Sequence, residues 1–252
     1  MNSVCIATYN GEKYIYDQLS SILSQINIDD EVIISDDNST DNTIQIINNI
    51  NDPRIKLIKG GFRNFTFNFE NAIKHAKGEY IFLSDQDDIW LPNKYATTLK
   101  YLKNYDLICS DAIITNQHLT PIHQSFFKYY NSGKGILKNT IKCSYCGACM
   151  AFNKKILQAI QPFPNTSIFG HDLWIGLVAE TIGKVYFLNT PLILYRRHDK
   201  SFTSISNNFL TRSKRPIHIK IKSRISIIYH LLKFKIQYYT CAFTFLFEKR
   251  SS

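Results

Sequence analysis

The chain has 252 residues, of which 44% are hydrophobic, so it is long enough for one large α/β domain with an appendage. Its net charge of +10 comes from one end: residues 212–252 hold ten lysines and arginines and one acid, leaving 20 basic and 19 acidic residues in 1–211. Because residues 1–211 are nearly neutral, the positive net charge of the whole chain does not indicate a nucleic-acid-binding protein.

The N-terminal residues predict the compartment. Met1–Cys5 lacks the basic segment of a secretory signal and runs directly into a strand-like stretch. No window approaches the ~20 apolar residues that a membrane-spanning helix needs. We therefore expect a cytoplasmic catalytic domain whose six cysteines are reduced.

Short apolar runs alternate with amphipathic stretches in the first 112 residues. The runs predict strands at 4–7, 31–35, 54–58, 79–83 and 106–112. Helical spacing of apolar residues predicts helices near 12–25, 41–50, 64–77 and 92–103. Gly78 is expected to end the third helix as a C-terminal cap. This alternation predicts a Rossmann-like, mostly parallel, doubly wound sheet with helices on both faces.

The pattern becomes less regular after residue 112. We expect a loop-rich insertion near 126–135, short helices at 136–141 and 153–160, a strand at 148–152, an apolar helix at 169–181, and two late strands at 184–188 and 192–196. The catalytic domain is predicted to cover 1–206 and a tail to cover 207–252.

Asp85, Asp87 and Asp88 lie within four residues, directly after the strand predicted at 79–83. Three carboxylates at the exit of a buried strand repel one another unless a cation binds there. Oxygen ligands of this kind suit Mg²⁺ or Mn²⁺, which in turn bridge phosphate oxygens. The alternative is an acidic turn that caps the next helix through Asp88 or Asn93. The segment alone leaves both interpretations open.

Three polar loops, at 8–10, 36–41 and 85–88, each follow a predicted strand. In an open α/β sheet, ligands bind at the carboxyl ends of the strands. We therefore expect these loops to converge along one edge of the sheet and to form the ligand site.

Five motifs occur in order along the chain. They are Thr8–Gly11, Asp36–Asp41, Asp85–Trp90, His171–Trp174 and Tyr195–His198. Together they resemble the family-two inverting glycosyltransferases of the GT-A fold, especially the rhamnosyltransferase-like bacterial branch. The resemblance covers roughly residues 2–200.

The resemblance implies roles for the donor-side residues. Thr8, Tyr9 and Asn10 are expected to bind the substrate, with Thr8 and Tyr9 lining the base pocket and Tyr9 offering an aromatic face for stacking. Asp37 is expected to accept a hydrogen bond from the base imide, which would favour uracil or thymine.

The resemblance also implies the catalytic groups. Asp85 and Asp87 are the expected ligands of Mn²⁺ or Mg²⁺ on the donor diphosphate, with Asp87 aligning best. Asp172 matches the catalytic base. Arg197 and His198 fall where the family has basic residues near the diphosphate.

These residues fit inverting transfer, in which one base takes a proton from the acceptor hydroxyl and a metal stabilises the leaving nucleoside diphosphate. We therefore predict a metal-dependent glycosyltransferase of the hexosyltransferase class. The expected donor is a UDP- or dTDP-sugar, and the expected acceptor is a lipid-linked bacterial surface glycan such as O-antigen or capsule. The alternatives are a nucleotidyltransferase of similar fold, a non-catalytic scaffold subunit and an Asp-x-Asp phosphatase.

Other conspicuous residues have ordinary interpretations. Trp90 and Trp174 are expected to pack helices. Cys143, Cys146 and Cys149 resemble a zinc motif, but a structural site needs four ligands, so small apolar side chains are the preferred interpretation. His171 stands where the family often has an acid, and its effect on Asp172 stays open.

The tail mixes isoleucines and aromatic residues with lysines and arginines, and it contains one acid, Glu248. A basic amphipathic helix of this kind is typical of proteins that lie on an anionic membrane. We expect peripheral association with the inner face of the cell membrane and no nucleic-acid binding. The alternative is a helical pair that packs on the catalytic domain or on a partner subunit.

Overall fold

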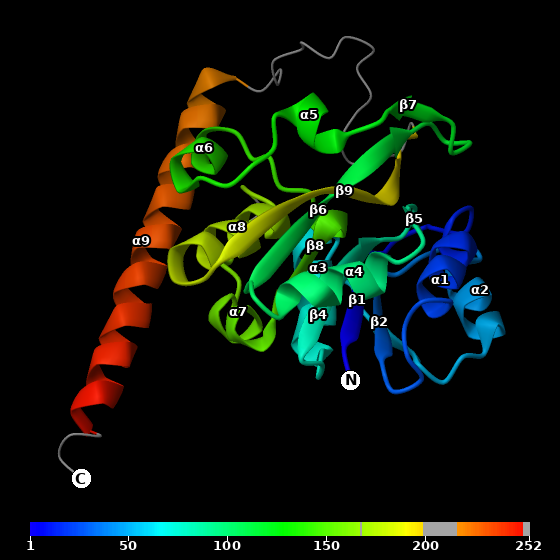
Figure 1. The fold of residues 1–252 in the computed structure, drawn as a ribbon, viewed down its shortest axis with the longest axis horizontal. Coiled ribbons are helices and arrows are strands. Elements are labelled where there is room, and N and C mark those ends of the chain that lie inside the picture. Colours follow the sequence, from blue (N-terminus) through cyan, green and yellow to red (C-terminus); the bar gives the residue numbers. More distant parts are fainter. Residues whose placement is uncertain (167, 199–215, 249–252) are drawn as a thin grey trace.

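The computed structural model describes residues 1–166, 168–198 and 216–248 (Figure 1). In these residues nine strands form one mixed sheet, and all but β7 follow the order β3-β2-β1-β4-β8-β6-β9-β5, with β7 paired to β6. The strands are β1 (Ser3–Thr8), β2 (Glu31–Asp36), β3 (Ile55–Lys59), β4 (Tyr80–Asp85), β5 (Ile89–Trp90), β6 (Leu107–Thr115), β7 (Pro121–His123), β8 (Met150–Asn153) and β9 (Val185–Arg196). The helices are α1 (Ile15–Leu23), α2 (Thr43–Ile50), α3 (Phe65–His75), α4 (Lys94–Leu102), α5 (Phe126–Tyr130), α6 (Ile136–Ile141), α7 (Lys154–Ala159), α8 (His171–Ile182) and α9 (Ile217–Glu248).

The first half of the sheet matches the predicted parallel arrangement. β2 pairs in parallel with β1 and β3, and β1 pairs in parallel with β4. β1, β2 and most of β4 are buried, as expected for strands covered by helices on both faces. Their carboxyl ends, with the three polar loops, therefore lie along one edge, as predicted.

The second half of the sheet is mixed. β8 runs antiparallel to both β4 and β6, whereas β6 and β9 are parallel. The two late strands predicted at 184–188 and 192–196 are wrong in one respect, because β9 is continuous and absorbs the break by register shifts beside Ser110–Ile113. The sequence also missed β5, a two-residue strand that pairs Ile89 and Trp90 with the end of β9.

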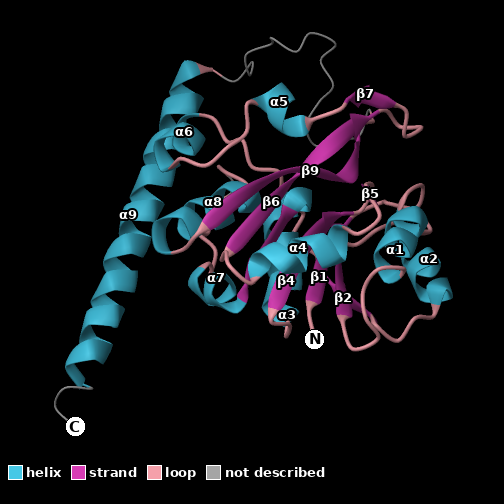
Figure 2. Ribbon diagram, in the orientation of Figure 1, coloured by secondary structure: helices cyan, strands magenta, loops and turns pink. Residues whose placement is uncertain are grey.

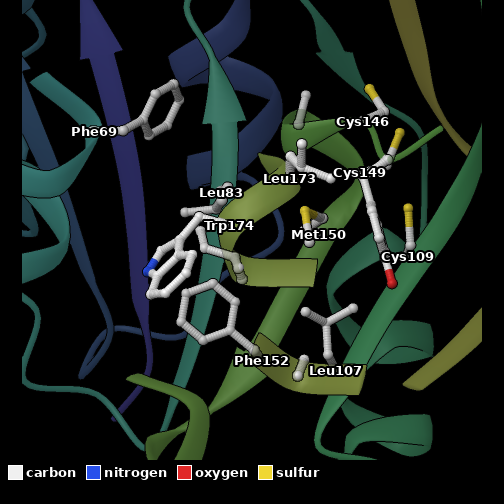
Figure 3. Packing of buried hydrophobic residues seen from close by; sticks show 14 of the residues in the cluster. Phe69, Leu83, Leu107, Cys109, Cys146, Cys149, Met150, Phe152, Leu173 and Trp174 are labelled. Carbon is white, nitrogen blue, oxygen red and sulfur yellow. The ribbon is translucent and has the colours of Figure 1, made fainter. Parts of the chain in front are cut away.

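Helices cover both faces of the sheet (Figure 2). One apolar cluster joins α1, α2 and α4 to the sheet, and a second joins α3, α7, α8 and part of α9. Figure 3 shows the second cluster, in which Leu83, Phe152 and Trp174 from β4, β8 and α8 meet. Both tryptophans are buried, at 2% exposure for Trp90 and 5% for Trp174, so the predicted packing role of each is met.

Gly78 does not cap α3 as predicted. The helix ends at Ala76, whose backbone is extended, and Gly78 is not in the left-handed conformation that the cap needs. The glycine is required by a close approach instead, because a Cβ at this position would lie 2.5 Å from the backbone nitrogen of Ser3.

The predicted domain boundary at Asn207 lies outside the described residues. In the described part of the predicted tail, residues 216–248, the structure has one long helix, α9, rather than a pair. No helix in the described ranges is long and apolar enough to cross a membrane.

Candidate active site

The loops after β1 and β2 are joined by Asn10. Its backbone N–H donates to Ser39 Oγ at 2.9 Å, and its side-chain Oδ1 accepts from the Thr40 backbone at 2.8 Å. Asn10 adopts a positive φ of 49°, a conformation that asparagine tolerates better than most residues. It therefore fixes the shape of the predicted base pocket, and a direct contact with substrate remains a prediction.

Gln86 connects the loop at residues 85–88, called the acidic loop below, to β1. Its Oε1 accepts from the Thr8 hydroxyl at 2.6 Å and from the Tyr9 backbone N–H at 2.9 Å. Thr8 is buried, so its hydroxyl is used within the protein. The Tyr9 side chain is 55% exposed, and its ring is therefore available for the predicted stacking on a base.

Asp37 holds a loop in this structure. Its Oδ1 accepts from the backbone of Gly61, Phe62 and Arg63 at 2.6–3.0 Å, and its Oδ2 accepts from Asn64 at 3.1 Å. An ionised carboxylate has about four lone-pair sites. The predicted contact with a base imide therefore competes with these amides, and it remains a prediction.

The acidic loop brings three carboxylates together. Asp85, Asp87 and Asp88 each offer an oxygen within 4.8 Å of the others. Within the described part of the chain, Asp85 Oδ1 and Asp88 Oδ2 are buried and accept no hydrogen bond. Burial and the neighbouring charges of Asp87 and Asp172 raise the pKa of Asp85 to about 8, and burial with the same kind of repulsion raises the pKa of Asp88 well above its usual range.

These observations fit a divalent cation. Unpaired, desolvated carboxylates are costly, and hard cations such as Mg²⁺ and Mn²⁺ prefer oxygen ligands of this kind. The alternative, in which Asp88 or Asn93 caps the next helix, does not hold. Asn93 occupies the cap position of α4 without a side-chain cap bond, and Asp88 accepts from the Arg196 backbone at 2.9 Å.

The end of β9 lies against this loop. His198 Nε2 is 2.7 Å from Asp87 Oδ2, so His198 contacts the cluster, and its predicted place near the donor diphosphate stays a prediction. Arg196 reaches the same loop, because its Nε donates to the Asp87 carbonyl at 2.7 Å and its Nη1 to the Gln117 carbonyl at 2.9 Å. The guanidinium also stacks on Tyr14, 4.6 Å from the ring centre.

Arg197 lies elsewhere. Its guanidinium donates to the hydroxyls of Tyr130 and Tyr195 at 3.4 Å, and it is buried. The arginine in contact with the acidic loop is therefore Arg196, and the predicted place of Arg197 near the donor diphosphate stays a prediction. A side chain alternates in direction along a strand, so two adjacent arginines at a strand end point to different surroundings.

Lys94 is buried at the start of α4, with 2% exposure. Its Nζ donates to the Ala148 carbonyl at 3.0 Å and lies 4.9 Å from the centre of the Trp90 ring. Burial lowers its pKa to about 8, while Asp88 and nearby thiols oppose this shift. This cation partly offsets the charge of Asp85 and Asp88 from within the core.

Asp172 stands at the beginning of α8. Its Oδ1 accepts from the Leu173 N–H at 2.7 Å, and its Oδ2 lies 3.9 Å from the Cys143 thiol, which donates to it. Burial raises the pKa of Asp172 to about 6, although these donors favour the ionised form. The charge of Asp172 contributes to the raised pKa of Asp85, so the two carboxylates repel each other electrostatically.

His171 is an aromatic packing residue. Its ring stacks on Phe69 at 4.1 Å between centres, and it is 2% exposed. Burial lowers its pKa to about 3, so the ring is neutral and places no charge beside Asp172.

Cys143, Cys146 and Cys149 do not form a group of metal-ligating side chains. Among the described residues, the one group of three or more such side chains close enough to hold an ion is in the acidic loop. Figure 3 shows Cys146 and Cys149 among apolar side chains, as the preferred interpretation predicts.

Gln86, Lys94 and Arg196 are not among the site residues predicted from the sequence. Gln86 lies inside a motif and Lys94 just beyond it, but lysines are mostly exposed, so the sequence gives no signal that Lys94 is buried. The sequence does not distinguish Arg196 from Arg197, because the direction of each side chain depends on how β9 ends in the folded chain.

Comparison with known proteins decides the family. Residues 3–161 match the model of "Glycosyl transferase family 2". The chain belongs to this family. This chain is 30% identical over 243 residues to WfaP of Escherichia coli, a UDP-Glc:α-D-GlcNAc-diphosphoundecaprenol β-1,3-glucosyltransferase. The alignment covers 90% of this chain and 91% of the relative. This chain is also 27% identical to the dTDP-rhamnosyl transferase RfbG of Shigella flexneri, covering 83% and 77%.

Solved structures show the fold. The crystal structure of S. aureus TarS with UDP-GlcNAc has a TM-score of 0.64 at 20% identity and covers 81% of this chain and 61% of that one. A Pyrobaculum calidifontis mannosyltransferase, solved with GDP-Man and Mn²⁺, has a TM-score of 0.56 at 18% identity and covers 79% and 57%. The predicted family, the GT-A fold and the predicted glycosyltransferase activity are confirmed.

Proposed function

We propose that this glycosyltransferase moves a sugar from a nucleotide-sugar to a hydroxyl of a lipid-linked glycan, with inversion at the anomeric carbon and with a divalent metal. The observation that carries the proposal is the contrast between two carboxylate environments. A cluster of three acids, two of which have a buried oxygen without a hydrogen bond among the described residues, lies after β4, and a separate single acid lies at the start of α8.

Asp85 and Asp87 are the proposed metal ligands, and Asp88 and His198 lie beside them. Mn²⁺ or Mg²⁺ bound there would neutralise charge on the departing nucleoside diphosphate. Arg196 keeps the loop in position by holding the Asp87 carbonyl and the Asp88 carboxylate through its side chain and its backbone N–H. Lys94 supports the same loop from the core side.

Asp172 is the proposed base. With a pKa raised to about 6, it is ionised at neutral pH and still basic enough to accept a proton from the attacking hydroxyl. The Leu173 N–H and the Cys143 thiol hold its two oxygens. His171 is neutral and leaves Asp172 as the single acid–base group of this helix end.

The donor is proposed to be a UDP- or dTDP-sugar. Tyr9 offers an exposed ring for the base, and Asn10 shapes the loop that carries it. The relatives support this donor class, since WfaP is named for UDP-glucose and RfbG for dTDP-rhamnose. Their names also support a lipid-linked acceptor, because WfaP acts on a GlcNAc-diphosphoundecaprenol.

A donor panel tests the proposal. The full chain is incubated with UDP-, dTDP- and GDP-sugars, a GlcNAc-diphospholipid and Mn²⁺ or EDTA, and the released nucleotide is identified. We expect nucleoside diphosphate from a UDP- or dTDP-sugar, loss of release in EDTA, and inverted anomeric configuration by NMR. Release of pyrophosphate would instead identify a nucleotidyltransferase, and preference for a GDP-sugar would contradict the role of Asp37.

A further inference from the structure

Helix α9 packs on the domain through one face. Ile227 and Leu231 are buried against it, and Phe234 contacts Trp174 with ring centres 5.8 Å apart. His230 contacts Phe169 at 5.9 Å. Figure 1 shows α9 along one side of the molecule, next to α6 and α8. Packing on the catalytic domain, the predicted alternative to membrane association, therefore explains the residues of this one face of α9.

A second face of α9 is apolar and uncovered. Its residues recur every three or four positions and are each at least 48% exposed: Ile217, Ile221, Ile225, Ile228, Leu232, Ile236 and Tyr239. This spacing places them in one row along the helix, separate from the row of Ile227, Leu231 and Phe234. We call this row the apolar stripe. A contiguous exposed stripe of isoleucine and leucine is unusual for a surface that meets only water.

Basic residues border the apolar stripe on both sides. Lys222 and Lys233 are about three helical turns apart and form one border, and Arg224 and Lys235 form the other in the same way. The sequence has no acidic residue from Lys200 to Phe247. The stripe is therefore an apolar surface on a helix that carries no acid before its last residue, Glu248.

We propose that the apolar stripe of α9 docks in the plane of an anionic lipid bilayer. The isoleucines would enter the boundary between headgroups and acyl chains, and the flanking lysines would reach the lipid phosphates. In its described residues α9 is not apolar enough to cross a membrane, and the proposed placement is therefore in the plane of the bilayer. Its packed face holds the catalytic domain to the same helix, which fixes the orientation of the domain on the membrane.

A second copy of the chain fits this surface less well. Two helices meeting through the stripe would bring their lysine and arginine borders together, and the helix offers no acid beside these borders, since its one acid is the terminal Glu248. Like charges across an interface oppose association. An anionic bilayer supplies the missing negative charge.

Vesicle binding by the full chain, without donor or acceptor, tests the proposal independently of glycosyl transfer. Sedimentation is measured with vesicles of phosphatidylcholine alone or mixed with phosphatidylglycerol. The wild type should bind the mixed vesicles and not the neutral ones. Ile225→Gln should weaken binding about tenfold, since one buried apolar side chain is lost. The matched control is Ile219→Gln, an exposed isoleucine outside the stripe, which should bind as the wild type does.

The charged borders have a separate signature. Lys222→Gln/Lys233→Gln should weaken binding to anionic vesicles by about fivefold per lysine at low salt and much less at high salt. Circular dichroism and thermal melting of each variant establish that it is folded. Equal binding by the Ile225 and Ile219 variants would overturn the proposal. So would a lipid-free dimer, by analytical ultracentrifugation, that Ile225→Gln converts to monomer.

Discussion

The acidic loop and the start of α8 present carboxylates in opposite surroundings. At the loop, Asp85 and Asp88 each have an oxygen that receives no donor from the described residues, and each carboxylate is close to the others. At α8, Asp172 has no acid beside it on its own helix and receives donors on both oxygens. Burial raises the pKa in both regions, but repulsion between acids adds to it at the loop.

This difference teaches which chemistry each region can perform. A cluster that cannot be fully ionised alone is stabilised by a cation. A single acid with a pKa near 6 is ionised at neutral pH and can still accept a proton. Substitutions that exchange an acid for its amide should therefore separate metal binding from proton transfer.

The largest effect is expected for Asp172→Asn. Loss of a general base costs about 10²–10⁴-fold in rate, so kcat should fall by that factor. Donor and Mn²⁺ affinity, measured by calorimetry, should stay within about twofold, because the acidic loop is unchanged. A variant that keeps most of its turnover would remove Asp172 from the role of base.

Asp87→Asn, unlike Asp172→Asn, should weaken the binding of Mn²⁺. Loss of an outer-shell partner of a metal ligand costs about 10–100-fold in metal affinity, and loss of a ligand itself should cost at least as much. Calorimetric titration with Mn²⁺ measures the change, and Asp172→Asn serves as the matched control. Wild-type Mn²⁺ affinity in the Asp87 variant would contradict the metal site.

The adjacent arginines offer a smaller, paired test. Arg196→Lys removes the fork that holds the Asp87 and Gln117 carbonyls, and a lysine cannot reproduce both contacts. We expect about a tenfold loss of Mn²⁺ affinity. Arg197→Lys disturbs two long contacts with tyrosine hydroxyls and should change Mn²⁺ affinity much less. Equal losses would show that Arg196 has no special hold on the loop.

The smallest expected effect is a shift in the pH profile. Because the pKa of Asp172 is raised to about 6, the base becomes protonated as pH falls through 6, and kcat should decline there. Cys143→Ala removes a weak donor to the ionised form, so the decline should move to higher pH by less than about one unit. A profile of kcat at saturating donor and metal measures both, and a shift to lower pH would contradict the contact.

Much of the fold followed from sequence because it depends on local patterns. Apolar runs and helical spacing located β1 to β4 and the helices between them, since each buried strand or helix face needs its own apolar residues. The mixed half was harder. β5 is two residues long, and the register shifts of β9 depend on its partner β6, so neither produces a periodic signal.

Within the site, the sequence by itself determined the residues whose chemistry is local. Asp85, Asp87 and Asp88 repel one another because they are close in sequence, and Asp172 lies in the first turn of an apolar helix. Only the tertiary structure decided that Arg196 rather than Arg197 meets the acidic loop, that amides occupy Asp37, and that Lys94 is buried beside Asp88. These outcomes depend on where distant segments meet. A side chain's burial and partners are set by packing, which no single stretch of sequence contains.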